Sequence, residues 1–499
     1  MSRIPGLVWN AGTARKGIGR SSPADHAFYD PGVRNEPQLI AYVDRLADDV
    51  DGVRRLLEGD LDGCFGGVHL LPYFDPIDGA DAGFDPIDHT AVDSRIGDWE
   101  AIARLATGRD LMSDLIVNHV SSRSPQFLDW LRRGASSEHD GMFLTLDSVF
   151  PDGATEADLL AIYRPRPGLP FTTHVRNDGS RRLMWTTFTG DQIDIDVEHP
   201  SGWGYLVDVL DRFAAANVSA IRLDAAGYAI KRAGTSSFML PETFDFIERI
   251  TEEAHRRDME VLVEIHSTHE TQQDIAARVD WVYDFALPPL VLDALFSADA
   301  RPIERWLLDR PTNAVTVLDT HDGIGIVDVQ GLLPPDRIEA LVDGIHERTA
   351  GESRLATGSA ASNLDLYQVN ATFTDALGND DARTLTARAI QMFTPGIPQV
   401  YYVGLLAGRN DIELLAATGV GRDINRHRYS ADEIAKCLDR PVVKSMLELL
   451  RLRRSHPAFE GRFDLLDSAD HELAMSWTAG EHSLRLDVDL RAGTHTISG

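Results

Sequence analysis

The chain has 499 residues, a formal net charge of −30, 43% hydrophobic residues and 25% charged residues. This composition is typical of a globular protein with a sizeable core. The negative charge argues against nucleic acid or an anionic membrane surface as a partner, because both are themselves negative.

Eight short apolar runs are predicted to be strands, and helical patterns such as residues 203–217 and 241–257 lie between them. The strand candidates are residues 38–43, 67–72, 110–119, 219–226, 260–266, 282–288, 314–321 and 398–404. Alternating strands and helices favour a parallel sheet, and eight such units are typical of the (β/α)8 TIM barrel. We therefore expect an α/β fold built on this barrel.

The predicted barrel is interrupted twice and extended at both ends. We expect an N-terminal extension (1–37), a catalytic barrel (38–119, 199–323 and 379–458), an inserted subdomain B after the third strand (120–198), a second insertion after the seventh strand (324–378) and a small C-terminal β domain (459–499). Residues 120–198 are rich in Pro, Gly, Arg and aromatic residues, whereas the last forty residues alternate as antiparallel strands do. Both insertions are expected to border the site.

Cysteine content and hydropathy bear on the compartment of the protein. Cys64 and Cys437 are too few for a disulfide framework and favour a reducing environment. The N-terminus lacks an apolar stretch long enough for a signal peptide, and no run of about 18 apolar residues occurs. We therefore expect a soluble, cytoplasmic protein.

Three acidic residues, Asp224, Glu264 and Asp322, each follow an apolar run that is predicted to be a strand. The carboxyl ends of barrel strands share one face, where active sites of this fold lie, so the three acids are expected to converge. Each acid alone could instead cap the next helix. The polar neighbours Arg222, His266 and His321 favour a common site.

Two carboxyl groups about 5–5.5 Å apart can cleave a glycosidic bond with retention, and a third can bind sugar hydroxyls. Alternation along a strand puts Arg222 on the same face as Asp224, so we expect the guanidinium to hold Asp224 ionised as a nucleophile. Glu264 has no adjacent arginine, which suits a carboxyl whose pKa is raised so that it donates a proton. A metallo-hydrolase is the alternative, although no HExxH spacing occurs.

Over roughly residues 38–456 the chain resembles the sucrose phosphorylases of the α-amylase superfamily. The superfamily motifs are DLIVNH (114–119), IRLDAAGY (221–228), EIHS (264–267) and LDTHD (318–322). More specific motifs are GADAGFDPIDHT (79–90), YRPRPGLPF (163–171), KRAGTSSFMLPETF (231–244), VYDFALPPL (282–290), SNLDLYQVN (362–370), PQVYYVGLLAGRNDIELL (398–415) and GRDINRHRYS (421–430). The ordered set is much more specific than any one motif.

The resemblance implies that Asp224 is the nucleophile, Glu264 the acid/base and Asp322 the group that clamps sugar hydroxyls in the transition state. The positions that the resemblance implies for substrate binding are Asp81, Phe84, His119, Phe188, Gln192, Arg222, His266, His321 and Arg422. Taken alone, Phe84 and Phe188 would more readily be ordinary core residues. Their motifs favour instead a platform and a wall for the sugar.

Phosphate must replace the leaving sugar, which requires a basic acceptor pocket. Arg166 is the best candidate, because a guanidinium grips phosphate through two parallel hydrogen bonds, although Arg164 and Arg166 could also be solvated loop charges. The remaining phosphate or acceptor candidates are Tyr163, His269, Leu364, Asp365, Tyr367 and Gln368. The resemblance implies no cofactor and no metal, although some superfamily members bind calcium beside the position of Asn118; it also suggests a homodimer.

Three departures from the family concern the acceptor side or the entrance. Residues 1–37 have no counterpart, Thr268-His269 replaces a Tyr-Tyr pair, and the segment 327–338 is shorter than usual. The expected reaction is sucrose plus phosphate to α-D-glucose 1-phosphate and D-fructose through a β-glucosyl-enzyme. The alternatives are phosphorolysis of sucrose 6′-phosphate, glucosylglycerol or glucosylglycerate, and an α-glucosidase or transglucosidase. A catalytically silent binding protein is disfavoured, because no motif acid is missing.

Overall fold

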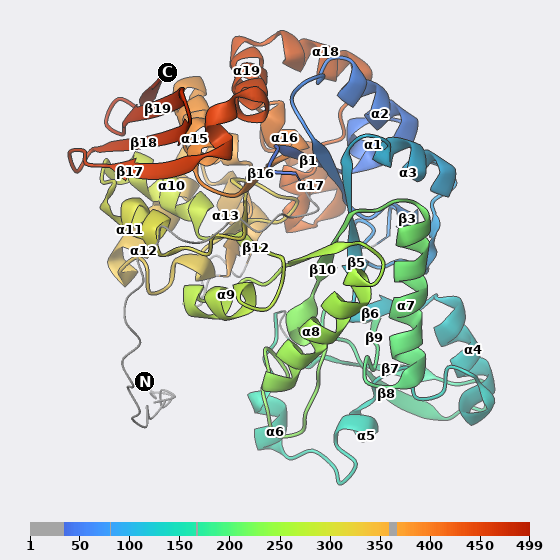
Figure 1. The fold of residues 1–499 in the computed structure, drawn as a ribbon. Coiled ribbons are helices and arrows are strands. Elements are labelled where there is room, and N and C mark those ends of the chain that lie inside the picture. Colours follow the sequence, from blue (N-terminus) through green and yellow to red (C-terminus); the bar gives the residue numbers. More distant parts are fainter. Residues whose placement is uncertain (1–33, 80, 166–167, 359–366) are drawn as a thin grey trace. The chain divides into compact units, whose positions relative to one another are not determined.

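Eight parallel strands close into a barrel, which confirms the predicted α/β fold (Figure 1). The structure, a computed structural model, describes residues 34–79, 81–165, 168–358 and 367–499. The barrel strands are β1 (Gln38–Ala41), β2 (Gly67–Leu70), β5 (Asp110–Ile116), β10 (Ala220–Asp224), β11 (Glu260–Val263), β12 (Trp281–Asp284), β13 (Ala314–Thr316) and β16 (Ile397–Tyr401). Neighbours along the chain are neighbours in the barrel, and β16 closes it against β1.

Several predicted strands are longer than the observed ones at their carboxyl ends. The predicted run 314–321 ends as a strand at Thr316, and the run 282–288 ends at Asp284 because a helix begins at Leu287. The residues beyond each end leave the hydrogen-bonded ladder and form the loops above the barrel. Strand interiors are buried on both faces, as in β5, which explains their nearly continuous apolar sequence.

Helices follow the strands and cover the barrel (Figure 1). They are α1 (Val43–Leu46), α2 (Val50–Glu58), α3 (Trp99–Ala106), α7 (Pro200–Ala215), α8 (Pro241–His255), α9 (His269–Ala276), α10 (Leu287–Ser297), α11 (Arg301–Asp309), α15 (Asp381–Phe393), α16 (Tyr402–Leu405), α17 (Ile412–Thr418), α18 (Ala431–Asp439) and α19 (Pro441–Ser455). Local sequence sets their starts: Asp49 and Asp98 accept hydrogen bonds from backbone N–H groups at the starts of α2 and α3. Proline occupies the first turn of α7 and α8.

The excursion between β5 and α7 contains small sheets and short helices. Its elements are β6 (His119–Ser121), α4 (Pro125–Arg133), α5 (Leu146–Val149), α6 (Glu156–Ala161), β7 (Phe171–Val175), β8 (Arg181–Trp185) and β9 (Gln192–Asp194). Strand β6 pairs with β9 and β7 pairs with β8, both antiparallel. A separate apolar cluster around Trp185 supports the segment. The exact boundaries predicted for this subdomain remain a prediction, as do the other domain limits.

Two further segments, one after β2 and one after β13, contain secondary structure of their own. Strands β3 (Phe74–Asp75) and β4 (Asp88–Val92) form a pair after β2. After β13 come β14 (Ile324–Gly325), the 3-10 helix η4 (Val327–Val329), α12 (Pro335–Arg348), α13 (Glu352–Thr357), β15 (Gln368–Val369) and α14 (Phe373–Ala376). Strands β14 and β15 pair antiparallel, with Gly325 opposite Gln368.

The C-terminal residues form a four-stranded antiparallel sheet in the order β17 (Arg462–Leu466), β18 (Glu472–Ala479), β19 (His482–Asp489) and β20 (Thr494–Ser498). It packs on α15, where the indole N–H of Trp477 donates to the carbonyl oxygen of Phe393 at 2.8 Å. In the part of the chain that the structure describes, none of the helices is long and apolar enough to cross a membrane.

Candidate active site

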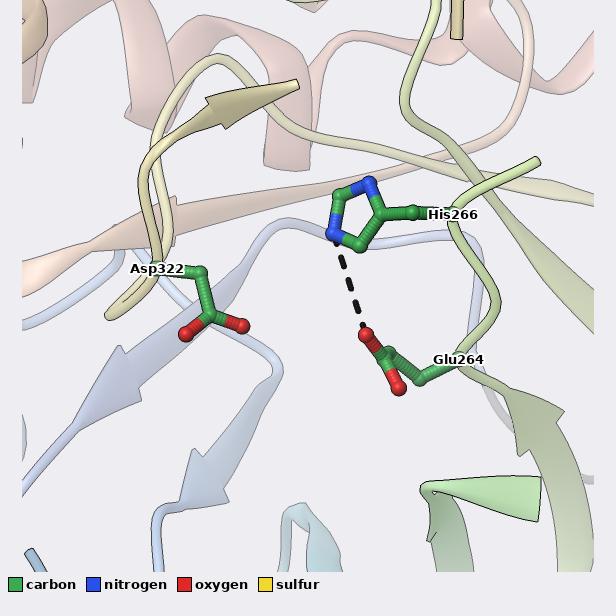
Figure 2. Close-up of side chains that lie close together, drawn as sticks. All are labelled: Glu264, His266 and Asp322. Carbon is green, nitrogen blue, oxygen red and sulfur yellow. Dashed lines mark ion pairs between the residues drawn. The ribbon is translucent and has the colours of Figure 1, made fainter. Parts of the chain in front are cut away.

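The three predicted acids lie at the carboxyl ends of barrel strands. Asp224 is the last residue of β10, Glu264 directly follows β11, and Asp322 lies in the loop after β13. Oxygens of Glu264 and Asp322 and a ring nitrogen of His266 lie within 4.8 Å of one another. Figure 2 shows the two carboxylates and the imidazole turned toward a common space. The tertiary structure therefore brings these acids together.

Arg222, on β10, connects the acids. Its guanidinium donates from Nη1 to Asp114 at 2.5 Å and to Asp224 at 3.0 Å, and its Nη2 lies 3.9 Å from Glu264 Oε1. Asp114, on β5, also interacts with His69 Nε2 at 3.0 Å. Burial alone would raise the pKa of Asp114, but His69 and Arg222 outweigh it and lower that pKa to about 2. One buried cation thus serves three carboxyl groups.

This sharing bears on the charge of Asp224. Arg222 contacts Asp224 as predicted, yet burial raises the pKa of Asp224 well above its ordinary value. Arg222 opposes that shift, whereas the negative charges of Glu264, Asp114 and Asp322 add to it. Arg222 thus favours the ionised form of Asp224, as expected, but burial and the neighbouring acids together have the larger effect on its pKa. Glu264 has no arginine beside it in the sequence, but the fold places Arg222 Nη2 3.9 Å from it.

Asp322 has the opposite electrostatic environment. Arg422 Nη1 lies 2.8 Å and Arg426 Nη2 lies 3.8 Å from Asp322 Oδ1, and His321 Nε2 lies 3.7 Å from Oδ2. Burial favours the neutral acid, but Arg422, Arg426 and Arg222 outweigh it and hold the pKa of Asp322 well below its usual range. Asp322 is therefore an ionised acceptor for hydroxyl groups. Sequence reasoning missed Arg426, although it stands in the same GRDINRHRYS motif as Arg422.

A second group of predicted residues forms one hydrogen-bonded patch. His119 Nε2 lies 2.9 Å from the carbonyl oxygen of Phe84 and 3.0 Å from Gln192 Nε2. Gln192 in turn donates to Asp81 Oδ2 at 3.4 Å. Strands β6 and β9 place His119 and Gln192 on this patch. Its amide, imidazole and carboxylate groups can bind the hydroxyls of a small polar ligand.

The predicted aromatic residues lie beside these polar groups. The Phe84 ring stacks on His321 with centroids 4.7 Å apart, and Arg222 lies 5.6 Å above the same ring. Burial lowers the pKa of His321 to about 3, so this imidazole is neutral. Phe188 meets His119 edge-on at 5.3 Å. Phe84 and Phe188 thus offer apolar surface next to hydrogen-bonding groups, as sugar sites require.

The structure brings together only some of the residues that are predicted to bind phosphate or the acceptor sugar. Gln368 Nε2 lies 3.1 Å from His266 Nε2, and the Tyr367 ring meets the His266 ring edge-on at 5.4 Å. The Tyr163 ring stacks on the ring of Phe238, which lies in the loop after β10, with centroids 4.5 Å apart. Arg166, Leu364 and Asp365 lie outside the described residues.

His269 lies at the start of α9, and the structure places it in contact with Glu270 and Trp306. Its Nε2 is 3.3 Å from Glu270 Oε1, and its ring meets Trp306 edge-on at 6.3 Å. These contacts do not support His269 as an extra cationic group for a phosphorylated acceptor, because the Glu270 carboxylate already faces its ring.

Sequence reasoning also missed Asp328, which accepts a 2.8 Å hydrogen bond from His266 Nδ1. The sequence offers only an indirect sign of Asp328, which is that it lies in the segment 327–338, a segment shorter than is usual in the family. Its pairing with His266 depends on two loops that follow different strands. It could be found only from the tertiary structure.

One group of the described residues has the geometry for a metal ion, and a second polar cluster already contains a lysine ammonium. By distance alone Glu264, His266 and Asp322 could hold a metal ion, but Arg222, Arg422 and Arg426 surround them with positive charge. Near Asn118 the protein supplies its own cation: Lys231 Nζ lies 2.6 Å from Asn118 Oδ1 and 2.6 Å from Asp194 Oδ2, and it also donates to the carbonyl oxygen of Tyr228. The expected absence of a metal remains a prediction.

The chain is similar over most of its length to characterised phosphorylases, although no family model matches it. It is 56% identical over 474 residues to a sucrose phosphorylase of Agrobacterium vitis, covering 93% of this chain and 97% of that protein. It is 51% identical over 471 residues to a sucrose phosphorylase of Bifidobacterium adolescentis, covering 92% and 93%. A glucosylglycerol phosphorylase of Marinobacter adhaerens is 39% identical over 471 residues, covering 93% and 97%.

Solved structures agree with this similarity. The crystal structure of sucrose 6F-phosphate phosphorylase from Thermoanaerobacter thermosaccharolyticum has a TM-score of 0.89 at 38% identity, covering 94% of this chain and 97% of that one. An α-amylase from H. orenii has a TM-score of 0.65 at 16% identity, covering 91% and 89%, which shows the shared fold alone.

Proposed function

The chain belongs to the sucrose phosphorylase family of the α-amylase superfamily, and from this premise we propose that it converts sucrose and phosphate to α-D-glucose 1-phosphate and D-fructose. The observation that carries the proposal is the higher identity to two sucrose phosphorylases than to a glucosylglycerol phosphorylase, over the same length of chain. The convergence of the three acids at the carboxyl face of the barrel supports it.

The first half of the proposed reaction forms a glucosyl-enzyme. Asp224 attacks the anomeric carbon of the glucosyl unit with a carboxylate oxygen, and the bond from that carbon to the fructosyl oxygen breaks. Glu264 gives its proton to the departing oxygen, so fructose leaves as a neutral sugar. The position of Arg222 between the two carboxyl groups supports these roles, since it can stabilise either carboxylate as its charge changes.

The second half transfers the glucosyl unit to phosphate. Glu264, now a carboxylate, takes a proton from phosphate while a phosphate oxygen attacks the anomeric carbon and the bond to Asp224 breaks. Two inversions give overall retention, so the product is the α-anomer. The reaction needs no redox change and therefore no redox cofactor.

Asp322 is proposed to hold two sugar hydroxyls as the ring distorts toward the transition state. Its firmly ionised state supports this role, because a carboxylate accepts hydrogen bonds from both hydroxyls. Arg422 keeps that carboxylate in place at 2.8 Å. Asp81, His119 and Gln192 are proposed to bind the remaining hydroxyls.

Phosphate recognition is proposed to rest on Arg166, Tyr367 and Gln368. Arg166 offers the bidentate geometry that phosphate prefers. The net charge of −30 does not exclude an anionic substrate, because at physiological salt the wider field is screened beyond about 8 Å. Local cations therefore decide the binding of phosphate.

The test is a product assay with sucrose and inorganic phosphate. We expect glucose 1-phosphate and fructose in equal amounts, and free glucose as the sole glucosyl product would instead indicate a hydrolase. The reverse reaction from glucose 1-phosphate, run with fructose, fructose 6-phosphate, glycerol and glycerate, identifies the acceptor. A clear preference for any of the last three would contradict sucrose as the substrate.

The remaining proposals concern partners and location. A homodimer is proposed because two-fold dimers are the commonest closed assemblies, and light scattering coupled to gel filtration measures it. We also propose that the protein acts in the cytoplasm, on small molecules and not on nucleic acid or membranes.

A further inference from the structure

Asp328 is a buried acid outside the proposed catalytic trio, and its carboxylate faces His266. It lies on η4, with 1% of its surface exposed, and its Oδ2 accepts a hydrogen bond from His266 Nδ1 at 2.8 Å. Its Oδ1 accepts from Gln272 Nε2 at 3.1 Å and from the backbone N–H of Ser267 at 3.3 Å. Both oxygens are thus fixed, so the carboxylate has a defined orientation.

The other edge of the His266 ring faces the acid/base candidate. His266 Nε2 lies 3.7 Å from Glu264 Oε1 (Figure 2) and 3.1 Å from Gln368 Nε2. The ring also stacks on Phe285 with centroids 3.9 Å apart and planes 14° from parallel. With one face against Phe285 and Nδ1 on Asp328, the ring has only one orientation that satisfies both contacts.

The backbone is shaped around this contact. A Cβ atom at Gly325 would lie 2.1 Å from Asp328 Oδ2 and 3.2 Å from His266 Nδ1, so the pair requires glycine there. Gly325 lies opposite Gln368 in the β14–β15 pair, and the N–H of Ile326 donates to the carbonyl oxygen of Tyr367 at 3.0 Å. The same short strand pair therefore sets both the Asp328 contact and the Gln368 contact of His266.

We propose that Asp328 is a positioning residue for the acid/base step, acting through His266 to hold the Nε2 edge of that ring against Glu264 and Gln368. The inference rests on the proposed function, in which Glu264 gives its proton to the fructosyl oxygen. When that proton leaves, a carboxylate remains 3.7 Å from His266. A ring protonated at Nε2 and held in place by Asp328 stabilises this new charge, whereas a ring free to rotate does so less well.

The electrostatics of His266 agree with this role. Burial disfavours a positive charge on the ring, but Asp328, Glu264 and Asp322 outweigh burial and raise the pKa of His266. A histidine whose Nδ1–H is fixed by a carboxylate has a defined tautomer and a more basic Nε2. That nitrogen is the one that faces Glu264.

The test compares two substrates with the variant Asp328→Asn. Fluoride leaves α-D-glucosyl fluoride without taking a proton from Glu264, whereas the fructosyl oxygen of sucrose needs one. We expect kcat/KM for sucrose to fall about 10- to 100-fold, by analogy with metal-binding histidines that lose their outer hydrogen-bond partner. We expect kcat/KM for the fluoride to stay within about twofold of wild type, because this ratio reports only the glucosylation transition state.

The matched controls separate positioning from folding. Asp293→Asn removes a buried carboxylate on α10 whose partner is Arg337 at 2.6 Å, and it should keep the wild-type ratio between the two substrates. On a His266→Gln background, Asp328→Asn should cause no further loss on sucrose, because the two residues act as one unit. Activity on the fluoride shows in each case that the barrel and the nucleophile are intact. If Asp328→Asn does not fold, Gly325→Ala displaces the same carboxylate. It should likewise lower activity on sucrose far more than activity on the fluoride.

Equal losses on sucrose and fluoride in Asp328→Asn, or an Asp293→Asn variant that loses activity on sucrose alone, would overturn the role of Asp328. So would additive losses in the double variant. These results differ from failure of the proposed function, in which the wild-type protein itself makes no glucose 1-phosphate from sucrose and phosphate.

Discussion

Replacing Asp322 by Asn should lower the stability of the protein as well as its activity. The carboxylate lies 2.8 Å from Arg422 and 3.8 Å from Arg426, whose side chain is 1% exposed. Breaking a buried ion pair leaves an uncompensated charge and costs about 3–5 kcal/mol. We take about 3 kcal/mol, because the Arg422 side chain is 32% exposed and can recover water. At about 2.1 cal/mol/K per residue, this lowers Tm by about 3 °C.

The matched substitution Asp224→Asn should have the opposite effect on stability. Burial and the charges of Glu264, Asp114 and Asp322 raise the pKa of Asp224, so ionising this side chain costs more in the folded protein than in the unfolded chain. A neutral amide of the same shape removes this cost. We expect stability at pH 7 to be unchanged or raised by up to about 2 kcal/mol, as is usual when a functional site loses a strained charge. Turnover should be lost in both variants.

The pH dependence follows from the two opposite shifts. The folded pKa of Asp224 lies above its unfolded value, so the stability it contributes is present below about pH 4 and is lost as the pH rises through the folded pKa. The folded pKa of Asp322 lies below its unfolded value, so its contribution is present above about pH 4 and is lost as the pH falls further. The gain in Asp224→Asn should therefore shrink toward pH 4, whereas the deficit in Asp322→Asn should persist there.

The assay is thermal unfolding of wild type and both variants at pH 7 and pH 4.5, at one scan rate because a chain of this size can unfold irreversibly. Turnover of sucrose is measured on the same samples. An Asp322→Asn variant as stable as wild type, or an Asp224→Asn variant that loses as much stability as Asp322→Asn, would refute this account of the charges.

Three further predictions address other groups. Glu264→Gln should lower kcat/KM for sucrose by about 10²- to 10⁴-fold and that for α-D-glucosyl fluoride far less; similar losses on both would contradict its role as proton donor. Arg166→Ala should raise KM for phosphate at least about tenfold while hydrolysis of sucrose in the absence of phosphate changes little, and a uniform loss would remove Arg166 from the phosphate site. Lys231→Met should lower Tm by about 3–5 °C, because it leaves the buried Asp194 without its 2.6 Å partner; an unchanged Tm would show that the ammonium is not needed for stability.

The barrel and the positions of the acids could be predicted because both depend on local sequence. A buried strand reads as a short apolar run, and the residue that follows it lies at the carboxyl end wherever the strand is placed. The sequence therefore predicts that Asp224 and Glu264 lie at one face of the barrel. The predicted strands were too long because apolar residues such as Val317 and Leu318 continue past the last ladder pair and are buried in the loop.

The distribution of charge among the acids could not be predicted in the same way. Alternation along β10 correctly pairs Arg222 with Asp224, but the register between β5 and β10 places Asp114 opposite Arg222 as well. The register of the two strands is set by packing of the whole barrel and cannot be inferred from the sequence of either strand alone. The consequence is that Asp114 and the other neighbouring acids add to burial in raising the pKa of Asp224.

The sequence by itself determined which residues carry the chemistry: the strands, the acids that follow them and the motifs around them are properties of short segments. Only the tertiary structure decided which of these groups share a counter-charge and which are oriented by a partner. Asp328 meets His266, and Arg426 meets Asp322, across loops that follow different strands. Such contacts depend on the closed barrel, because Coulomb and hydrogen-bond energies follow distance in space and not separation along the chain.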